Sequence, residues 1–532
     1  MPTYRQGTKP LHDYLRDHAR TQPDKPAFIW YGTRITYAEL DAWSDAFAAA
    51  LQTLGVRQGD RVALFLNNCP QYVVAHFGIQ KAGAIVGPCG PLFKAMELEY
   101  QLKDLGAEVI VAADNLLPVL DQVRGNTAIR HVFVTRYADL LPARADIAVP
   151  PELQAPAAAR REGMHDLVAA MRSGEKPQAV EVSLDDVALL TYTSGTTGLP
   201  KGAMLSFGNA LCKASAAADC NGVRADDVVL AIAPLYHIAG MLMGINVTVY
   251  TGATTVLLHR FDPLATAQAI DKYRISWWYS IAPMNVAVMQ LAQAKDYDLS
   301  SLKVNAATSF GITLTEALAS QWRAFTGHAE LFEAAYGLSE THTMDTYMPR
   351  ERVKWGTHGV PAPGVEIRIV DPDSGADLPR GSQGEIVLRS DGVFKGYWNK
   401  PEATAATLRD GWVHTGDMGV LDEEGYLTFQ GRFKEMIKVS GYSVFPEEVE
   451  TLLIRHPAVA QAAVIGVADA HRGEVVKAVI VRKPDVATSA AEIMAWSREH
   501  MSAYKVPRHV VFRDSLPVTG AGKVLRRLLK DG

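Results

Sequence analysis

Cysteine is scarce in this sequence: four cysteines occur among 532 residues, and no two of them form a C-x-x-C pair. This spacing counts against a zinc site, and four cysteines in so long a chain do not make a disulfide scaffold. We therefore expect small buried thiols in a reducing cytoplasm.

An excess of positive charge is also missing, because 53 lysines and arginines stand against 58 aspartates and glutamates, a formal net charge of -5. This balance gives no reason to expect a nucleic-acid partner. The N-terminal region lacks the apolar run of a signal peptide, so a cytoplasmic location is predicted. Residues 238–258 carry no charge and could span a bilayer, but their glycines and threonines favour a buried helix, a glycine turn and a buried strand. No transmembrane segment is expected.

Hydrophobic residues make up 48% of the chain, more than one small core needs, so two or more domains are expected. In the first four-fifths, β-rich runs alternate with helical patterns, which is typical of an α/β fold with helix-covered, mostly parallel sheets. The predicted strands are 61–66, 108–113, 131–135, 187–192, 228–233, 253–258, 276–280 and 330–335, and the clearest helices are 206–219 and 313–325.

The sequence pattern changes from about residue 364, where predicted short strands alternate with glycine and aspartate turns. This pattern indicates a barrel-like or antiparallel β module, and the last hundred residues form a further small α+β unit. We predict an N-terminal domain over 1–431 and a C-terminal domain over 432–532. The segment 141–185, rich in alanine, proline and arginine, is expected to be a surface excursion with one helix.

The most particular local pattern runs from Thr191 to Gly202 and reads Thr-Tyr-Thr-Ser-Gly-Thr-Thr-Gly-Leu-Pro-Lys-Gly. Glycines allow the backbone to approach an anion, and the hydroxyls and the lysine can bind phosphate oxygens. We predict a phosphate-binding loop between a strand and a helix. The loop lacks the ending of a Walker A motif, which counts against kinases and motor NTPases. Its candidate ligands are Thr193, Ser194, Gly195, Thr196, Thr197, Gly198 and Lys201.

This loop resembles the signature loop of the AMP-binding, adenylate-forming superfamily, which includes acyl-CoA synthetases, luciferases and the adenylation domains of peptide synthetases. Four further motifs resemble that family in its order: Tyr336-Gly-Leu-Ser-Glu340, Thr415-Gly-Asp417, residues 431–441, and Pro517-Val-Thr-Gly-Ala-Gly-Lys523. The match covers nearly the whole chain. It implies a large adenylation domain, a small mobile C-terminal domain that rotates about a hinge at Lys434, and ATP, Mg²⁺ and coenzyme A as ligands.

The resemblance implies how the adenine would be held. Tyr336 would stack on the base, with Ala334 and Ala335 beside it and Gly337 in the same motif. Ser339 stands where the family usually has threonine, and it keeps the hydroxyl for a phosphate contact. The alternative for Tyr336 is a core tyrosine at the end of a strand.

The resemblance also implies the ribose and metal ligands. Asp417 would accept hydrogen bonds from the ribose hydroxyls with Arg432 assisting, and the alternative is a turn residue. Glu340 would hold Mg²⁺ on the phosphates of ATP, since a hard cation prefers carboxylate oxygen.

Lys523 is the predicted catalytic lysine of the first half-reaction. Its charge would offset the repulsion between the attacking carboxylate and the α-phosphate. Without the resemblance it would be a surface lysine near a basic tail (Arg526, Arg527, Lys530). After the domain rotation, a second face would meet the coenzyme A entrance. The residues expected on that face are Lys438, Ser440 and Gly441.

The acid would be recognised by other residues. His237 matches a position that lines the acyl pocket in the family, and the alternative is a buried histidine without a direct role. Apolar wall residues favour an apolar acid, a medium- to long-chain fatty acid. Phe310 stands where the family usually has glycine, and it could block a deep acyl tunnel or rotate to line it. Benzoate- or cinnamate-type acids therefore stay open. The expected wall residues are Ile238, Gly240, Met241, Trp278, Ser309, Phe310 and Gly311.

The acceptor is expected to be free coenzyme A. The alternatives are a carrier-protein phosphopantetheine arm, a luciferase-type oxidation, and a non-catalytic nucleotide-binding homologue. The intact Lys523, Glu340 and Asp417 count against the last of these. A homodimer stays open as an assembly.

Overall fold

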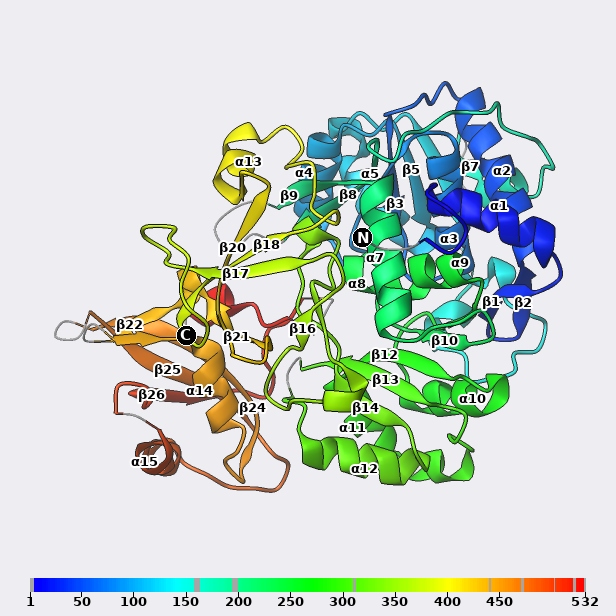
Figure 1. Cartoon of the computed structure of the whole chain (residues 1–532). Helices are drawn as coiled ribbons and strands as arrows, with labels where there is room; N and C mark the ends of the chain where they lie inside the picture. Colours follow the sequence, from blue (N-terminus) through cyan, green and yellow to red (C-terminus); the bar gives the residue numbers. More distant parts are fainter. Residues whose placement is uncertain are drawn as a thin grey trace.

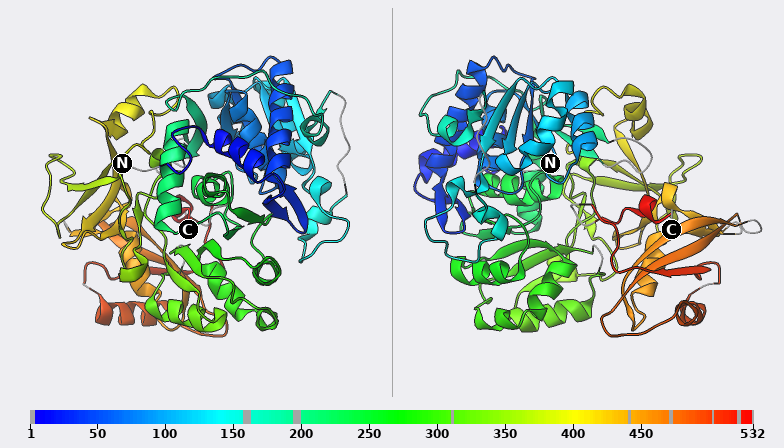
Figure 2. Two further views of the ribbon diagram at one scale, coloured as in Figure 1. Left: turned by 45° about the vertical axis from the view of Figure 1, so that its right-hand side comes forward. Right: turned by 180° about the vertical axis from the view of Figure 1, so that it is seen from behind.

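The computed structural model describes residues 4–156, 163–193, 200–309, 312–439, 442–469, 473–501, 503–519 and 523–530. Two seven-stranded sheets form its larger part, and a smaller α+β unit at the C-terminal end lies beside them (Figures 1 and 2). The predicted α/β class with mostly parallel sheets and a separate smaller unit is confirmed.

Sheet I is parallel except for its last pair of strands. It contains β3 (Arg61–Phe65), β4 (Ile85–Pro88), β5 (Val109–Ala113), β6 (His131–Thr135), β7 (His165–Asp166), β8 (Val187–Thr193) and β9 (Lys201–Ser206). The strand order is β7-β6-β5-β3-β4-β8-β9, with β8 and β9 antiparallel. The phosphate loop therefore joins two strands of a hairpin, so the prediction that a helix follows it directly is wrong. The helix begins only after β9, at Phe207.

Sheet II has the same size and a similar plan. It contains β1 (Pro26–Trp30), β2 (Thr33–Thr36), β10 (Val228–Ala231), β11 (Thr254–Leu257), β12 (Trp277–Ile281), β13 (Val304–Thr308) and β14 (Glu330–Glu333). The order is β14-β13-β12-β10-β11-β1-β2, parallel except for the β1–β2 hairpin. Parallel strands need crossover connections, which explains why helices separate them along the sequence.

Helices cover both sheets. They are α1 (Leu11–Thr21), α2 (Tyr37–Thr53), α3 (Pro70–Lys81), α4 (Ala95–Leu105), α5 (Leu117–Val123), α6 (Leu167–Met171), α7 (Phe207–Cys220), α10 (Pro263–Tyr273), α11 (Ala282–Gln290) and α12 (Glu316–Thr326). A capping box between Ser206 and Asn209 begins α7. Every residue of α3 is buried, as expected of a helix that lies inside a core. The excursion 141–185 contains α6 and also β7, which pairs with the edge of sheet I.

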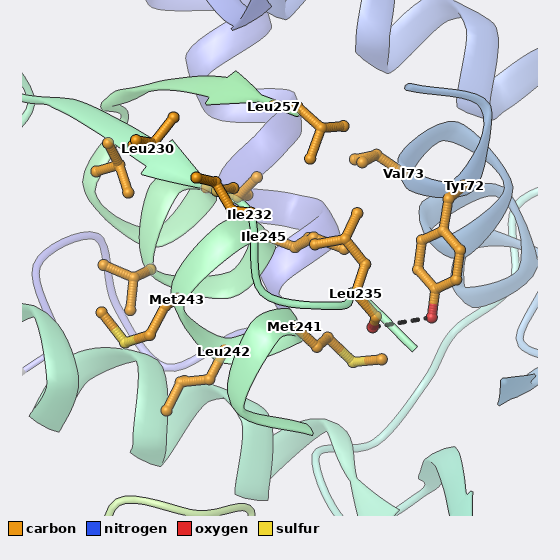
Figure 3. Packing of buried hydrophobic residues seen from close by; sticks show 14 of the residues in the cluster. Tyr72, Val73, Leu230, Ile232, Leu235, Met241, Leu242, Met243, Ile245 and Leu257 are labelled. Atoms are coloured by element: carbon orange, nitrogen blue, oxygen red, sulfur yellow. Dashed lines mark hydrogen bonds between the residues drawn. The ribbon is translucent and has the colours of Figure 1, made fainter. Parts of the chain in front are cut away.

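Residues 238–258, which carry no charged side chain, fold inside the core as predicted. It forms α8 (Ile238–Met241), a π-helical turn (Leu242–Asn246), α9 (Val247–Thr251), a left-handed Gly252 at φ +76° and then β11. Figure 3 shows its side chains packed with those of β10, β11 and α3, where the Tyr72 hydroxyl donates to the Leu235 carbonyl at 3.1 Å. In the part of the chain that the structure describes, no helix is both long and apolar enough to cross a membrane.

The predicted β module is a five-stranded antiparallel sheet. It consists of β17 (Glu366–Val370), β18 (Gln383–Arg389), β19 (Leu408–Arg409), β20 (Trp412–Leu421) and β21 (Leu427–Arg432), with α13 (Pro401–Thr407) beside it and a small ladder of β15 (Thr346–Tyr347) and β16 (Val360–Pro361). The long strand β20 was not among the predicted elements.

The C-terminal unit has hydrophobic cores of its own. Its sheet has the order β23-β22-β25-β24, with β26 parallel to β25. The elements are β22 (Ile437–Val439), β23 (Tyr442–Val444), α14 (Pro446–Leu453), β24 (Val459–Asp469), β25 (Gly473–Arg482), α15 (Ala490–His500) and β26 (His509–Phe512). The domain boundary at residue 431 stays a prediction.

Candidate active site

Asp417 is a fixed acceptor held by two neighbours. It lies in β20 opposite Arg432 of β21, and the Arg432 Nε is 2.6 Å from the Asp417 Oδ1. The Tyr336 hydroxyl donates to the other carboxylate oxygen at 2.6 Å. The turn alternative for Asp417 is therefore wrong. Burial raises the pKa of Asp417 to about 6, and the Arg432 and Lys523 cations oppose that rise.

Tyr336 follows β14, and its ring is almost fully buried. The ring stacks on Phe429, with centroids 5.8 Å apart. Ala334 and Ala335 are half-buried against the same core. Stacking of Tyr336 on adenine stays a prediction, but the bond to Asp417 couples the two motif residues directly.

Tyr397 contacts both Glu340 and Lys201, the lysine of the phosphate loop. Glu340 lies in the 3₁₀ turn Ser339–Thr341, and its Oε1 accepts from the Tyr397 hydroxyl at 2.6 Å. The Lys201 ammonium lies 4.3 Å from the centre of the Tyr397 ring. The sequence reasoning missed Tyr397, which lies outside every recognised motif. Thr193 ends β8 and Lys201 begins β9, whereas Ser194, Gly195, Thr196, Thr197 and Gly198 lie outside the described residues.

A left-handed turn follows Glu340. His342, Thr343 and Met344 have φ values of 58°, 59° and 53°. Each such residue costs about 1–2 kcal/mol when it is not glycine. A Cβ on Gly337 would lie 2.4 Å from the Met344 nitrogen, so the close passage of this turn accounts for the glycine of the motif.

Lys523 is hydrogen-bonded to Thr519 and lies near these groups. The Thr519 N–H donates to the Lys523 carbonyl at 2.7 Å, and the Lys523 N–H donates to the Thr519 Oγ1 at 3.1 Å. Burial and the Arg432 cation lower the pKa of Lys523, while Asp417 opposes this shift. The red C-terminal chain runs from the small sheet toward the large part of the molecule (Figure 1). The structure thus brings Lys523 within electrostatic range of the Asp417 motif.

The neighbouring arginine is not part of a solvated basic tail. Arg526 is within 2.5 Å of Glu435, 2.8 Å of Glu447 and 2.9 Å of Glu450. These bonds tie the chain after Lys523 to α14 and to the 3₁₀ turn Phe433–Glu435. The tail alternative is therefore wrong for Arg526, and sequence reasoning missed the cluster because its glutamates lie far from it along the chain.

His237 lies within the electrostatic range of Lys523. Its surface is exposed, yet burial first and Lys523 second lower its pKa. Within the described residues, no side-chain hydrogen bond to the His237 ring is seen. This geometry leaves the ring free to face a bound acid.

The predicted wall residues after His237 are tightly packed. Ile238 and Met241 are 3% and 1% exposed, and Met241 lies among the core side chains in Figure 3. A Cβ on Gly240 would lie 2.1 Å from the Pro234 oxygen, so Gly240 serves a close backbone approach. Opening a deep acyl channel here would require these side chains to move.

Trp278 was predicted to line the pocket, and this stays a prediction. Its side chain is fully buried against Trp322 of α12, with ring centroids 6.0 Å apart. Side chains alternate across a strand, so the next residue, Tyr279, faces the other side of sheet II. Tyr279 is partly exposed, and its hydroxyl lies 3.1 Å from the Thr308 hydroxyl.

Glu333, which sequence reasoning missed, holds the start of the predicted acyl loop. The Ser309 hydroxyl donates to one Glu333 carboxylate oxygen, and the Ser309 N–H donates to the other at 3.2 Å. Burial raises the pKa of Glu333 to about 7. Phe310 and Gly311 lie outside the described residues.

The predicted hinge and coenzyme A residues stay predictions. Lys434 lies in the turn Phe433–Glu435 and Lys438 in β22, and only their backbone positions are described. Ser440 and Gly441 lie outside the described residues.

Comparison with known proteins agrees with the motifs. A family model described as AMP-binding enzyme matches residues 15–398, and one described as AMP-binding enzyme C-terminal domain matches residues 448–523. A long-chain-fatty-acid–CoA ligase of Bacillus subtilis (strain 168) is 36% identical over 534 residues, which cover 98% of this chain and 94% of that protein. A feruloyl-CoA synthase of Amycolatopsis sp is 36% identical over 510 residues, 96% of each chain.

A solved structure also matches over nearly its whole length. An anthranilate CoA ligase in complex with anthranoyl-AMP superimposes with a TM-score of 0.85 at 29% identity, covering 99% of this chain and 97% of that chain.

Proposed function

The chain belongs to the family of AMP-binding enzymes, and on that premise we propose that it is an ATP-dependent ligase that joins a fatty acid to coenzyme A through an acyl-adenylate. The observation that carries the proposal is the meeting of Lys523, Arg432, Asp417 and Tyr336 at one site, with His237 in the electrostatic range of Lys523. These residues come from distant parts of the sequence, and a ribose, a phosphate and a carboxylate each find a partner among them.

In the first step, a carboxylate oxygen of the acid attacks the α-phosphorus of ATP, and the bond to the bridging oxygen breaks to release pyrophosphate. Lys523 places a positive charge where the two anions meet, which stabilises the developing charge without moving a proton. Asp417 accepts hydrogen bonds from the ribose and so orients the nucleotide for attack.

In the second step, the sulfur of coenzyme A attacks the acyl carbon, its proton is lost, and AMP leaves with the electrons of the broken C–O bond. We assign the two domains to 1–431 and 432–532 and place the hinge at Lys434. The separate cores of the C-terminal unit support this division, because a unit with its own core can move as a body.

Mg²⁺ fits the residues present. Glu340 would hold it together with the phosphates of ATP, where the cation would neutralise negative charge. Within the described ranges no cluster of three histidine, cysteine, aspartate or glutamate side chains could hold a metal. A single carboxylate suits Mg²⁺, which keeps most of its ligands as water and phosphate.

The fatty-acid assignment draws on the apolar character of residues 238–243 and on the long-chain ligase among the relatives. Methionine side chains are unbranched and can move to admit an acyl chain. An aryl acid is the second candidate, favoured by the feruloyl-CoA synthase at 36% identity and by the tight packing of Ile238 and Met241. A cytoplasmic location and a homodimer also stay predictions.

The test is to measure thioester formation across acids from acetate to palmitate, together with benzoate and cinnamate. We expect a thioester of coenzyme A with medium- or long-chain acids. Thioester with aryl acids alone would contradict the fatty-acid assignment. Adenylate without any thioester would contradict coenzyme A as the acceptor and make a carrier protein the leading candidate.

A further inference from the structure

A buried ion pair joins α7 to the left-handed turn after Glu340. The Lys213 ammonium lies 2.7 Å from the Asp345 Oδ1 and donates to the Met344 carbonyl at 3.1 Å. The two charged side chains are 1% and 0% exposed. One lysine therefore holds the last residue of the turn and the residue that follows it.

Asp345 also forms hydrogen bonds with one residue before and one residue after Glu340 in the sequence. Its carboxylate accepts from the Thr341 hydroxyl, directly after Glu340, and its N–H donates to the Tyr336 carbonyl at 2.8 Å. The Thr346 hydroxyl accepts from the Tyr336 N–H at 2.8 Å. Residues 336–346 thus form a closed loop, which Lys213 joins to α7 through Asp345 and the Met344 carbonyl.

Helix α7 also contacts residues 391–394, which lie outside this loop and include a hydrogen-bond donor to Glu340. A Cβ on Gly392 would lie 2.3 Å from the Lys213 Cε, so this glycine makes room for the lysine. One turn earlier on α7, the Asn209 amide donates to the Asp391 and Val393 carbonyls at 2.7 and 3.1 Å. The next residue, Phe394, donates its N–H to the Glu340 carbonyl at 2.8 Å.

A buried ion pair is weak evidence for stability, because desolvation of the two charges offsets their attraction. Here the pair lies against three consecutive left-handed residues, a conformation that persists only where the surroundings enforce it. We propose that Lys213 and Asp345 are positioning residues, which hold the left-handed turn so that Glu340 meets the metal ion on the phosphates of ATP. This inference rests on the proposed function of Glu340.

The test compares Lys213→Met with the wild-type protein. We measure the Mg²⁺ dependence of ATP binding by calorimetry and, separately, the two half-reactions. The expected result is a rise of roughly 10–100-fold in the dissociation constant of Mg²⁺-ATP, the range seen when a residue that orients a metal ligand is removed. Thioester formation from supplied acyl-adenylate should stay near the wild-type rate, since that step no longer uses the pyrophosphate end of ATP.

Two further variants separate positioning from folding. Lys213→Met with Asp345→Asn removes both charges, so no unpaired carboxylate stays buried, and it should still show the weakened Mg²⁺-ATP binding. Lys81→Met removes another buried lysine, whose bonds among the described residues go to Asp41 and Asp45 and not to the site. It should lower stability while leaving the Mg²⁺ dependence of the folded protein unchanged.

Wild-type Mg²⁺-ATP affinity in a folded Lys213→Met protein would overturn the inference, and so would an equal loss in Lys81→Met. A wild-type protein without acid-dependent pyrophosphate release would instead contradict the proposed function, and the binding measurement would still report on the ion pair.

Discussion

The nucleotide side and the acid side of the site are built differently. On the nucleotide side, polar groups are fixed by short bonds, as where Asp417 binds both Tyr336 and Arg432 at 2.6 Å. On the acid side, Met241 and its neighbours belong to a packed apolar core and are held mainly by contacts between apolar side chains. Hydrogen bonds constrain residue type and spacing, whereas apolar packing constrains mainly volume. ATP recognition can therefore be read from motifs, and acid recognition cannot.

The largest expected effect is at the lysine that serves the nucleotide side. Lys523→Ala should slow adenylate formation by about a thousandfold, because the charge at the reacting anions is lost. Conversion of supplied acyl-adenylate and coenzyme A to thioester should continue. Rapid-quench assays of each half-reaction check this. Equal loss in both steps would contradict a role confined to the first.

The next effect concerns the protonation of Asp417. With a pKa of about 6, this carboxylate is ionised at neutral pH and gains a proton as the pH falls through that value. Protonation removes acceptor capacity, so KM for ATP should rise below about pH 6. The profile of KM against pH measures it, and Asp417→Asn should give a flat profile at a higher KM. A titration that persists in Asp417→Asn would assign it to another group.

A smaller effect is expected at Tyr397, whose hydroxyl donates to the Glu340 carboxylate. Tyr397→Phe removes the hydroxyl that donates to Glu340 and should raise the Mg²⁺ requirement about tenfold, since hydrogen bonds to charged groups contribute about 1.5–3 kcal/mol. Titration of activity with Mg²⁺ measures it. In the control Tyr37→Phe, the lost bond is to the Ala253 carbonyl at 2.6 Å. That variant should lose about 1 kcal/mol of stability and keep its Mg²⁺ requirement.

The smallest effects on catalysis are expected on the acid side. Phe310→Gly should extend acceptance toward longer acids, because the family places glycine there. Trp278→Phe should cost about 2 kcal/mol of stability through the cavity beside Trp322, with an unchanged acid profile. Chain-length profiles and thermal unfolding measure the two. An altered acid profile in Trp278→Phe would show that Trp278 lines the acid pocket.

The α/β class and the positions of most strands in the two large sheets were predicted from the sequence. Tyr336, Asp417, Arg432 and Lys523 were predicted to bind ATP, and the structure brings these residues together. Strand β9 was not predicted, because the glycine-rich loop and the helical spacing after it hid a strand that pairs with β8. The packing of Trp278 against Trp322 was also not predicted, because strand register, and not composition, decides which face a side chain takes. Tyr397 and Glu333 reach the site only through tertiary contacts with distant residues, for which a single sequence gives no signal.

The most direct test of the central claim is acid-dependent exchange of labelled pyrophosphate into ATP by the wild-type protein without coenzyme A. We expect exchange with fatty acids, which would show reversible adenylate formation before any thiol is present. Exchange that appears only after coenzyme A is added, or with no acid at all, would contradict an acyl-adenylate as the first intermediate.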